Sequence, residues 1–147
     1  MRHELAFDIT NFTIVHLAIA NPAAATNFTS AVTAGVIRQL VGLRFTLTTD
    51  ATAPSRRASV VFNNGAVNTL RVMASNAITA SLTWDINFAI AQQNASLAAG
   101  DNVITAPLCD MHYLADGYTF SSQILNMGVA DALTDIIATY KQWIIPT

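Results

Sequence analysis

The stretch Leu40–Phe62, LVGLRFTLTTDATAPSRRASVVF, decides how this chain folds. Its first half alternates: Phe45 and Leu47 share one face with polar residues between them, and this period of two predicts a half-buried β-strand. Residues 49–55 contain Asp, Thr and Pro, which favour turns. Ser59–Phe62 is a second, compact β-prone run. The stretch therefore predicts a hairpin: a strand, a tight polar turn and a second strand.

Similar patterns predict strands along the rest of the chain. An Asn-Gly pair at residues 63–65 predicts a two-residue hairpin turn, and Gly42 predicts a bulge or bend within a long strand. The C-terminal residues fit a helix over 129–140 or a strand over 134–145, and their β-branched content favours the strand. The other expected strands are 10–20, 35–48, 66–73, 78–90, 102–106, 108–114 and 118–127.

Eight or nine strands without a clear helix predict an all-β fold. Regularly spaced strands separated by turn residues are typical of antiparallel sandwiches and barrels. An immunoglobulin domain would place two cysteines around a tryptophan, whereas the sequence has the single Cys109. The strand lengths favour an antiparallel jelly-roll-like sandwich of about eight strands. We expect an N-terminal arm and strand over residues 1–30 and the jelly-roll domain over residues 31–147.

Composition indicates a protein that associates with other subunits. Only 11% of the 147 residues are charged, against about 25% in an average globular protein, and the mean hydropathy is +0.41. Such a chain has few charges with which to cover its surface. The net charge of −2 and the single Lys141 argue against a nucleic-acid partner. No signal peptide or membrane-spanning helix is expected, so we predict cytoplasmic synthesis.

The candidate interface elements are two apolar segments, at 12–20 and 143–145, and the arginine pair at 56–57. Residues 10–20 are apolar on both faces, which predicts burial in the sandwich or against a neighbouring subunit. The adjacent arginines are expected to form salt bridges with a neighbouring subunit or with a local aspartate such as Asp50. The candidate interface residues are Phe12, Ile14, His16, Arg56, Arg57, Trp143 and Ile145.

No catalytic motif is found in the sequence. The aspartates are scattered, and several of them fall at expected turns, where a structural role is favoured. Asp110 and His112 would share a face on a strand and, with one further ligand, could bind a metal as in cupins, but the histidine-rich cupin cluster is missing. Cys109 is expected to be a small, partly buried apolar residue. We therefore expect no catalytic residue, no cofactor and no metal.

Four segments together resemble a known group of proteins. They are LRFTLTTDATAPSRRASVVF at 43–62, GDNVITAPL at 100–108, LADGYTF at 114–120 and IIATYKQWI at 136–144. This combination of strand endings and turns resembles the small jelly-roll structural proteins of tailed bacteriophage virions. The similarity spans roughly residues 32 to 145 and leaves the N-terminal arm outside it.

The resemblance implies a non-enzymatic role in the virion. It favours a capsid decoration or cement subunit, expected as a homotrimer, that contacts the major capsid protein or other virion proteins. The alternative is a tail- or fibre-associated module that binds a receptor or carbohydrate through exposed aromatic residues, with Trp84, Tyr113 and Tyr118 as candidates. A cupin-like enzyme that uses Asp110 and His112 is the third and least favoured hypothesis.

Overall fold

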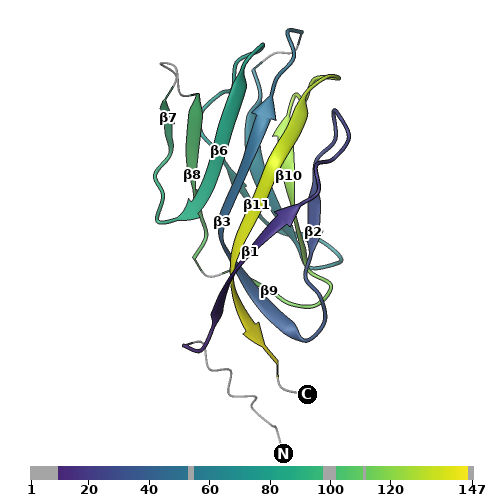
Figure 1. The fold of residues 1–147 in the computed structure, drawn as a ribbon, viewed down its shortest axis with the longest axis vertical. Coiled ribbons are helices and arrows are strands. Elements are labelled where there is room, and N and C mark those ends of the chain that lie inside the picture. The colour runs from purple at the N-terminus through teal and green to yellow at the C-terminus, as the bar shows by residue number, and fades with distance from the viewer. Residues whose placement is uncertain (1–9, 53–54, 98–101, 111, 146–147) are drawn as a thin grey trace, which may run out of the picture.

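The computed structural model describes residues 10–52, 55–97, 102–110 and 112–145, which form strands, turns and loops. Two sheets pack face to face (Figure 1). In chain order the strands are β1 (Thr13–Ile19), β2 (Thr29–Ala31), β3 (Val36–Thr48), β4 (Arg57–Asn63), β5 (Asn68–Met73), β6 (Thr83–Ile90), β7 (Ala95–Leu97), β8 (Val103–Leu108), β9 (Tyr113–Leu114), β10 (Thr119–Leu125) and β11 (Ala132–Ile144).

Strand order identifies the sandwich as jelly-roll-like. The first sheet has the order β1-β11-β3-β6-β8-β7, with β9 paired to β3, and the second has the order β2-β10-β4-β5. Without β7, β8 and β9, eight strands remain, and they form the nested antiparallel pairs β1·β11, β2·β10, β3·β6 and β4·β5. The chain is thus wrapped as one long folded hairpin, as in jelly rolls. The all-β fold class predicted from the sequence is confirmed.

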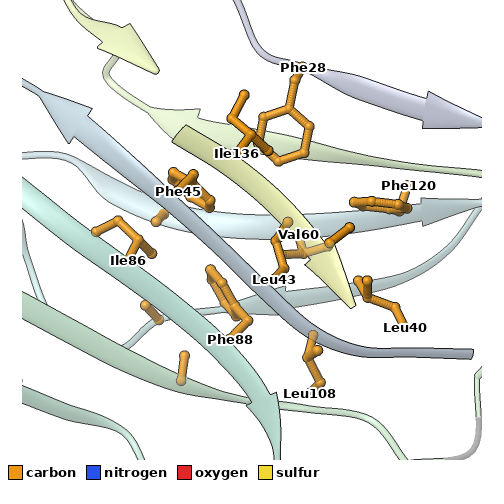
Figure 2. Packing of buried hydrophobic residues seen from close by; sticks show 14 of the residues in the cluster. Phe28, Leu40, Leu43, Phe45, Val60, Ile86, Phe88, Leu108, Phe120 and Ile136 are labelled. Atoms are coloured by element: carbon orange, nitrogen blue, oxygen red, sulfur yellow. The ribbon is translucent and has the colours of Figure 1, made fainter. Parts of the chain in front are cut away.

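Aromatic and aliphatic side chains from both sheets fill the space between them. Phe45 and Phe88 point inward from the first sheet, and Phe120 points inward from the second (Figure 2). Phe28, just before β2, lies edge-on to Phe45 and Phe120, with ring centroids 5.6 and 6.2 Å away. Because burial of apolar area is the main favourable term in folding, this layer holds the sandwich together.

The expected hairpin at 40–62 is instead a crossing between the two sheets. β3 lies in the first sheet and β4 in the second, and the two strands are not paired. The inward side chains of β3, such as Phe45, and those of β4, such as Val60, bury themselves against one core from opposite sides. A hairpin would have placed them side by side in one sheet, so the hairpin prediction is wrong.

The bend expected at Gly42 is found one residue away. In the β11·β3 ladder Thr139 pairs with Gly42 and Tyr140 pairs with Leu40, so Val41 is an extra residue on β3. This is the pattern of a β-bulge. A second irregularity lies on β11 between Thr134 and Ile137.

The hairpin at the Asn-Gly pair is confirmed, but its loop is longer than predicted. Asn63 pairs with Asn68, so four residues connect β4 and β5. The side chain of Asn64 accepts hydrogen bonds from the amides of Ala66 and Val67, at 3.1 and 2.9 Å. Gly65 has a φ of +92°, which favours glycine at this position.

The strand predicted over 78–90 begins later, at Thr83. A turn precedes the strand. The hydroxyl of Thr49 holds this turn by hydrogen bonds to the carbonyls of Thr79 and Leu82, both at 2.9 Å. Ser81 has a φ of +58°, outside the range of a strand. Leu82, predicted on the apolar face, is 40% exposed as a result.

Three segments between β6 and β10 differ from the strands and turns expected from the sequence. β7 lies within a segment predicted as a loop, and β8 runs through Pro107 and pairs with β6 in parallel. The turn at Asp116-Gly117 is confirmed, with the amide of Tyr118 donating to Ala115 at 3.0 Å, but it leads from β9 in one sheet to β10 in the other. The C-terminal segment is a strand, β11, as favoured.

Candidate interaction surface

The first candidate element, β1, is an edge strand of the first sheet. It pairs with β11 from Thr13↔Gln142 to Ile19↔Ile136, and its exposed and half-buried residues alternate. Leu17 and Ile19 pack against the core, whereas Ile14 is 48% exposed. Of the two alternatives for this segment, burial of both faces within the sandwich is therefore wrong, and burial against a neighbouring subunit stays a prediction. The strand presents one apolar face and one unpaired backbone edge outward among the described residues.

Three aromatic residues, one before β1, one in β11 and one in β9, form a cluster. Trp143 lies between Phe12 and Tyr113, with ring centroids 5.7 and 5.6 Å away and edge-on geometry on both sides. We call these three residues the Trp143 cluster. Trp143 itself is 4% exposed, and its two neighbours cover it while remaining more than a third exposed. Lys141 lies over the Phe12 ring at 5.0 Å, a cation–π contact.

The cluster lies on the outward face of the first sheet. Side chains alternate along β11, and Tyr140 points inward, where its ring meets Phe120 of the opposite sheet at 6.0 Å. Lys141 and Trp143 therefore point outward, as do Ile14 and His16 on β1 by the register of the pair. The structure thus brings four predicted interface residues, Phe12, Ile14, His16 and Trp143, onto one margin of the molecule.

The last residues of β11 complete this margin. Ile144 is 77% exposed, which makes it one of the most exposed large apolar side chains of the described residues. It lies within the C-terminal segment 143–145 that was predicted as an interface element, although it was not singled out there. Ile145 is half-buried, and its amide donates to the carbonyl of Gly35 at 2.9 Å.

His16 occupies the middle of β1 and is exposed. Its Nδ1 lies 3.0 Å from the hydroxyl of Thr139 on β11, which is its cross-strand partner. The imidazole is thereby held against the outward face of the sheet, close to the open edge of β1.

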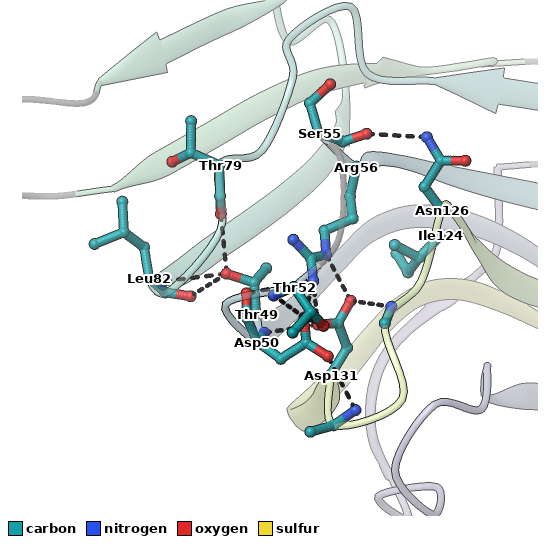
Figure 3. Close-up of polar contacts among 12 residues, drawn as sticks. Thr49, Asp50, Thr52, Ser55, Arg56, Thr79, Leu82, Ile124, Asn126 and Asp131 are labelled. Carbon is teal, nitrogen blue, oxygen red and sulfur yellow. Dashed lines mark hydrogen bonds and ion pairs between the residues drawn. The ribbon is translucent and has the colours of Figure 1, made fainter.

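Arg56 is buried inside the chain. Its Nε lies 2.7 Å from Asp131 Oδ2, and its second terminal nitrogen lies 2.7 Å from Asp131 Oδ1 and from Asp50 Oδ1 (Figure 3). The side chains of Arg56 and Asp131 are 0% exposed. Of the two alternatives for this arginine, the structure shows the local aspartates. We call Asp50, Arg56 and Asp131 the corner triad.

Hydrogen bonding keeps the corner triad charged. The amide of Thr52 lowers the pKa of Asp50 to about 2, against the effect of burial and with help from Ala130 and Arg56. Burial acts to raise the pKa of Asp131, but hydrogen bonds from Arg56 and from two amides outweigh it and lower that pKa. The hydrogen bond to Asp131 raises the pKa of Arg56. The triad therefore joins two loops, the β3–β4 loop and the β10–β11 loop, by permanent charges.

Arg57 has a different environment from its neighbour. It is exposed at the first position of β4, where the alternation of the strand turns it to the outward face of the second sheet. The two arginines, paired in the prediction, therefore point to opposite sides of β4.

The residues considered for metal or thiol chemistry, Cys109, Asp110 and His112, have different surroundings. Asp110 accepts hydrogen bonds from the Gln39 side chain through its carbonyl and its carboxylate. The ring of His112 packs at a tilt of 59° against that of Phe62, with centroids 4.6 Å apart, and burial lowers the pKa of His112. In the described part of the chain, no three His, Cys, Asp or Glu residues form a group suited to a metal. Cys109 is exposed, so the expectation of partial burial is wrong.

The aromatic residues proposed for carbohydrate binding are mostly covered. Trp84 is 3% exposed, with its Nε1 lacking a hydrogen-bond partner, and Tyr118 packs against the core. Tyr113 is 37% exposed but leans on Trp143. None of the three forms an open stacking platform.

Shallow hollows occur on both sheets. A hollow of about 470 Å³ surrounds Gly42 on the first sheet, with Arg44, Asn87 and Thr139 at its rim. Two hollows of about 390 and 290 Å³ adjoin on the second sheet and share Asn68 and Gln123. Open sites of this kind can hydrogen-bond a ligand but do not exclude water as catalytic pockets do.

Comparisons with known proteins do not add a relative. No protein-family model matches the chain, and no curated protein or solved structure matches it. Among the described residues, no helix is long and apolar enough to cross a membrane.

Proposed function

We propose that the chain is a non-enzymatic structural subunit of a virion, most simply a capsid decoration or cement protein. It acts by associating with copies of itself, with a trimer favoured by the resemblance, and with the major capsid protein or other virion proteins. Jelly rolls serve as viral capsid proteins but also as lectins and cupins, so the fold alone supports this role weakly.

The margin formed by β1 and the Trp143 cluster is the observation that carries the proposal. It combines an uncharged edge strand with exposed apolar residues at Phe12, Ile14 and Ile144. Edge strands in monomeric proteins are usually protected by charges, prolines or short length. A chain with only 11% charged residues that leaves such a margin open is suited to permanent contacts, which bury large apolar areas.

Two measurements test the proposal. Light scattering on the purified chain at micromolar concentration should give the mass of an oligomer, and a stable monomer would contradict self-association. Immunogold labelling of particles purified from cells that make this chain should place it on the particle surface. Absence of label from intact and from opened particles would contradict the virion role.

A tail- or fibre-associated glycan-binding role is the second candidate. The adjoining hollows on the second sheet favour it, because amide side chains at Asn68 and Gln123 and the guanidinium of Arg71 suit hydroxyl-rich ligands. A glycan array probed with the isolated protein tests it. Binding that an Asn68→Ala and Gln123→Ala double variant removes would support this role, and an array without binding would count against it.

A further inference from the structure

Among the described strands, β1, β7, β2 and β5 lie at the outer edges of the two sheets, and they differ in how they are protected. β2 and β7 have three residues each, and β5 carries Arg71. Short length and charge are the usual devices that stop a strand edge from pairing with another chain. β1 has neither device, because its seven residues, TIVHLAI, contain no proline and no Asp, Glu, Lys or Arg.

The missing partner of β1 must complement hydrogen-bonding groups as well as apolar side chains. Within the described residues β1 pairs only with β11, so one row of its amide and carbonyl groups faces away from the sheet. Another strand satisfies such a row, as in β-strand addition. The low charge of the whole chain points to a partner that is always present, and a second copy of the chain meets that condition.

We infer that two copies pair antiparallel along β1 about a twofold axis, with His16 on that axis. The register follows from the length of the strand. His16 is the fourth of the seven residues Thr13–Ile19, so the one antiparallel self-pairing that uses all seven places it opposite His16 of the other copy. Ile14 then faces Ala18 of the other copy, and the first sheets of the two copies become one continuous sheet.

This inference deepens the proposed function and rests on it for the premise that the chain associates with copies of itself. The contact is isologous and closes a dimer. In a lattice, the same contact would join neighbouring oligomers. It also aligns the apolar margins of the two copies, because both outward faces lie on the same side of the joined sheet.

The register makes the contact sensitive to pH. Directly opposed like charges destabilise a strand pair, and histidines gain their charge between about pH 8 and pH 5. Around His16, the charged groups on the adjoining strands are Lys141 on β11, Arg44 on β3, and Asp135 beside the end of β1. Two cations and one carboxylate do not neutralise a charged histidine pair, so the dimer should weaken at acidic pH.

Cysteine cross-linking tests the register directly, in a Cys109→Ser background that removes the exposed native thiol. With His16→Cys, the two thiols lie on directly opposed residues, whose Cα atoms are about 4.5–5.5 Å apart and within disulfide range. A mild oxidant should convert most of this variant to a covalent dimer. With Ile14→Cys on the same strand and face, the two thiols are offset by four residues, roughly 14 Å along the strands, and should not be bridged.

A charge variant supplies an independent readout on the otherwise unchanged chain. His16→Lys should raise the dimer dissociation constant at least about tenfold in sedimentation measurements, since it places like charges opposite each other. Ala95→Lys, on the opposite edge of the same sheet, should leave it unchanged. His16→Gln should retain the dimer and remove its weakening at acidic pH. Thermal melts show whether each variant is folded.

The outcomes separate this inference from the proposed function. A monomer overturns both the β1 contact and the self-association on which the proposed function rests. An oligomer whose mass is unaffected by His16→Lys overturns the β1 contact alone. An oligomer that cross-links equally through positions 14 and 16, or that is insensitive to pH, overturns the His16-centred register. Dimerisation that appears only after deletion of residues 1–9 would show that the chain's own N-terminal segment occupies the edge. A cross-linked dimer absent from particles overturns the virion role alone.

Discussion

At the scale of single residues, Arg56 and Arg57 are neighbours in the chain with opposite environments. Arg56 is enclosed by two carboxylates, whereas Arg57 is exposed on β4. Arg56→Met should destabilise the fold by about 3–5 kcal/mol, because it leaves Asp131 charged and buried without its partner. Arg57→Met, the matched control, should stay within about 0.5 kcal/mol. Urea unfolding of both variants measures the difference, and equal effects would contradict the structural role of the triad.

The carboxylates of the corner triad predict how stability depends on pH. The folded-state pKa of Asp50 is about 2, and that of Asp131 is also lowered. A lowered pKa stabilises the fold above the unfolded value, about 3.9, and this contribution is lost as the pH falls toward 2. Unfolding midpoints should therefore fall between about pH 4 and pH 2. Asp50→Asn should flatten this dependence, and an unchanged slope would contradict the assignment.

Gly128 lies beside the corner triad, and its lack of a side chain leaves room for Asp50. A Cβ atom at this position would meet the carboxylate of Asp50 at its Oδ1, 2.6 Å away, where contact is not tolerated. Gly128→Ala should therefore displace Asp50 from Arg56 and lower the melting temperature. Gly117→Ala probes a glycine with open space around it but a φ of +78°, so its cost comes from the backbone alone. Each variant is then made again in an Asp50→Ala chain and its melting temperature is measured. We expect the Gly128→Ala effect to depend on the Asp50 carboxylate and therefore to disappear in that chain.

At the scale of strands, β1 both completes the first sheet and forms its edge. Leu17 and Ile19 pack against the core, and seven pairs join β1 to β11. Deletion of residues 1–20 should therefore destabilise the sandwich and expose β11, in addition to weakening assembly. Deletion of residues 1–9 alone, measured in parallel, isolates the contribution of β1. Chemical denaturation of both truncations measures this, and a full-stability Δ1–20 chain would show that β1 is dispensable for the fold.

Local patterns predicted strands well but could not predict which strands pair. The alternation of Phe45 and Leu47 identified β3, and the Asn-Gly pair identified the β4–β5 hairpin. The alternation does not say whether a polar turn leads back into the same sheet, and here it leads to the other one. The parallel pairing of β8 with β6 also depends on contacts that a local pattern does not contain.

The candidate surface was also only partly predictable, because local patterns show apolar runs but not contacts between distant residues. Apolar terminal segments indicated Phe12, Ile14 and Trp143, which the structure brings together. The separation of the two arginines was not predictable, because Asp131, the partner that buries Arg56, is 75 residues away in the chain. Sequence spacing alone does not place residues so distant side by side.

At the scale of the whole molecule, the jelly-roll wrap joins the two ends of the chain. Thr13 pairs with Gln142, and the start of β1 lies at the same end of the sandwich as the end of β11 (Figure 1). The aromatic contact between Phe12 and Trp143 strengthens this closure. Both ends of the described chain are therefore presented at one pole, beside the margin proposed for assembly.

This wrap has a consequence for how the protein is made. The hairpin β4–β5 can form as soon as it is synthesised, but β1 emerges first and its partner β11 emerges last. Contacts between residues so far apart in sequence form slowly, because the intervening chain must be closed into a loop. During synthesis, β1 therefore waits unpaired, with its apolar residues exposed. During this interval, β1 can also pair with the β1 strand of another newly made chain. The order of synthesis therefore favours contacts between copies of the protein.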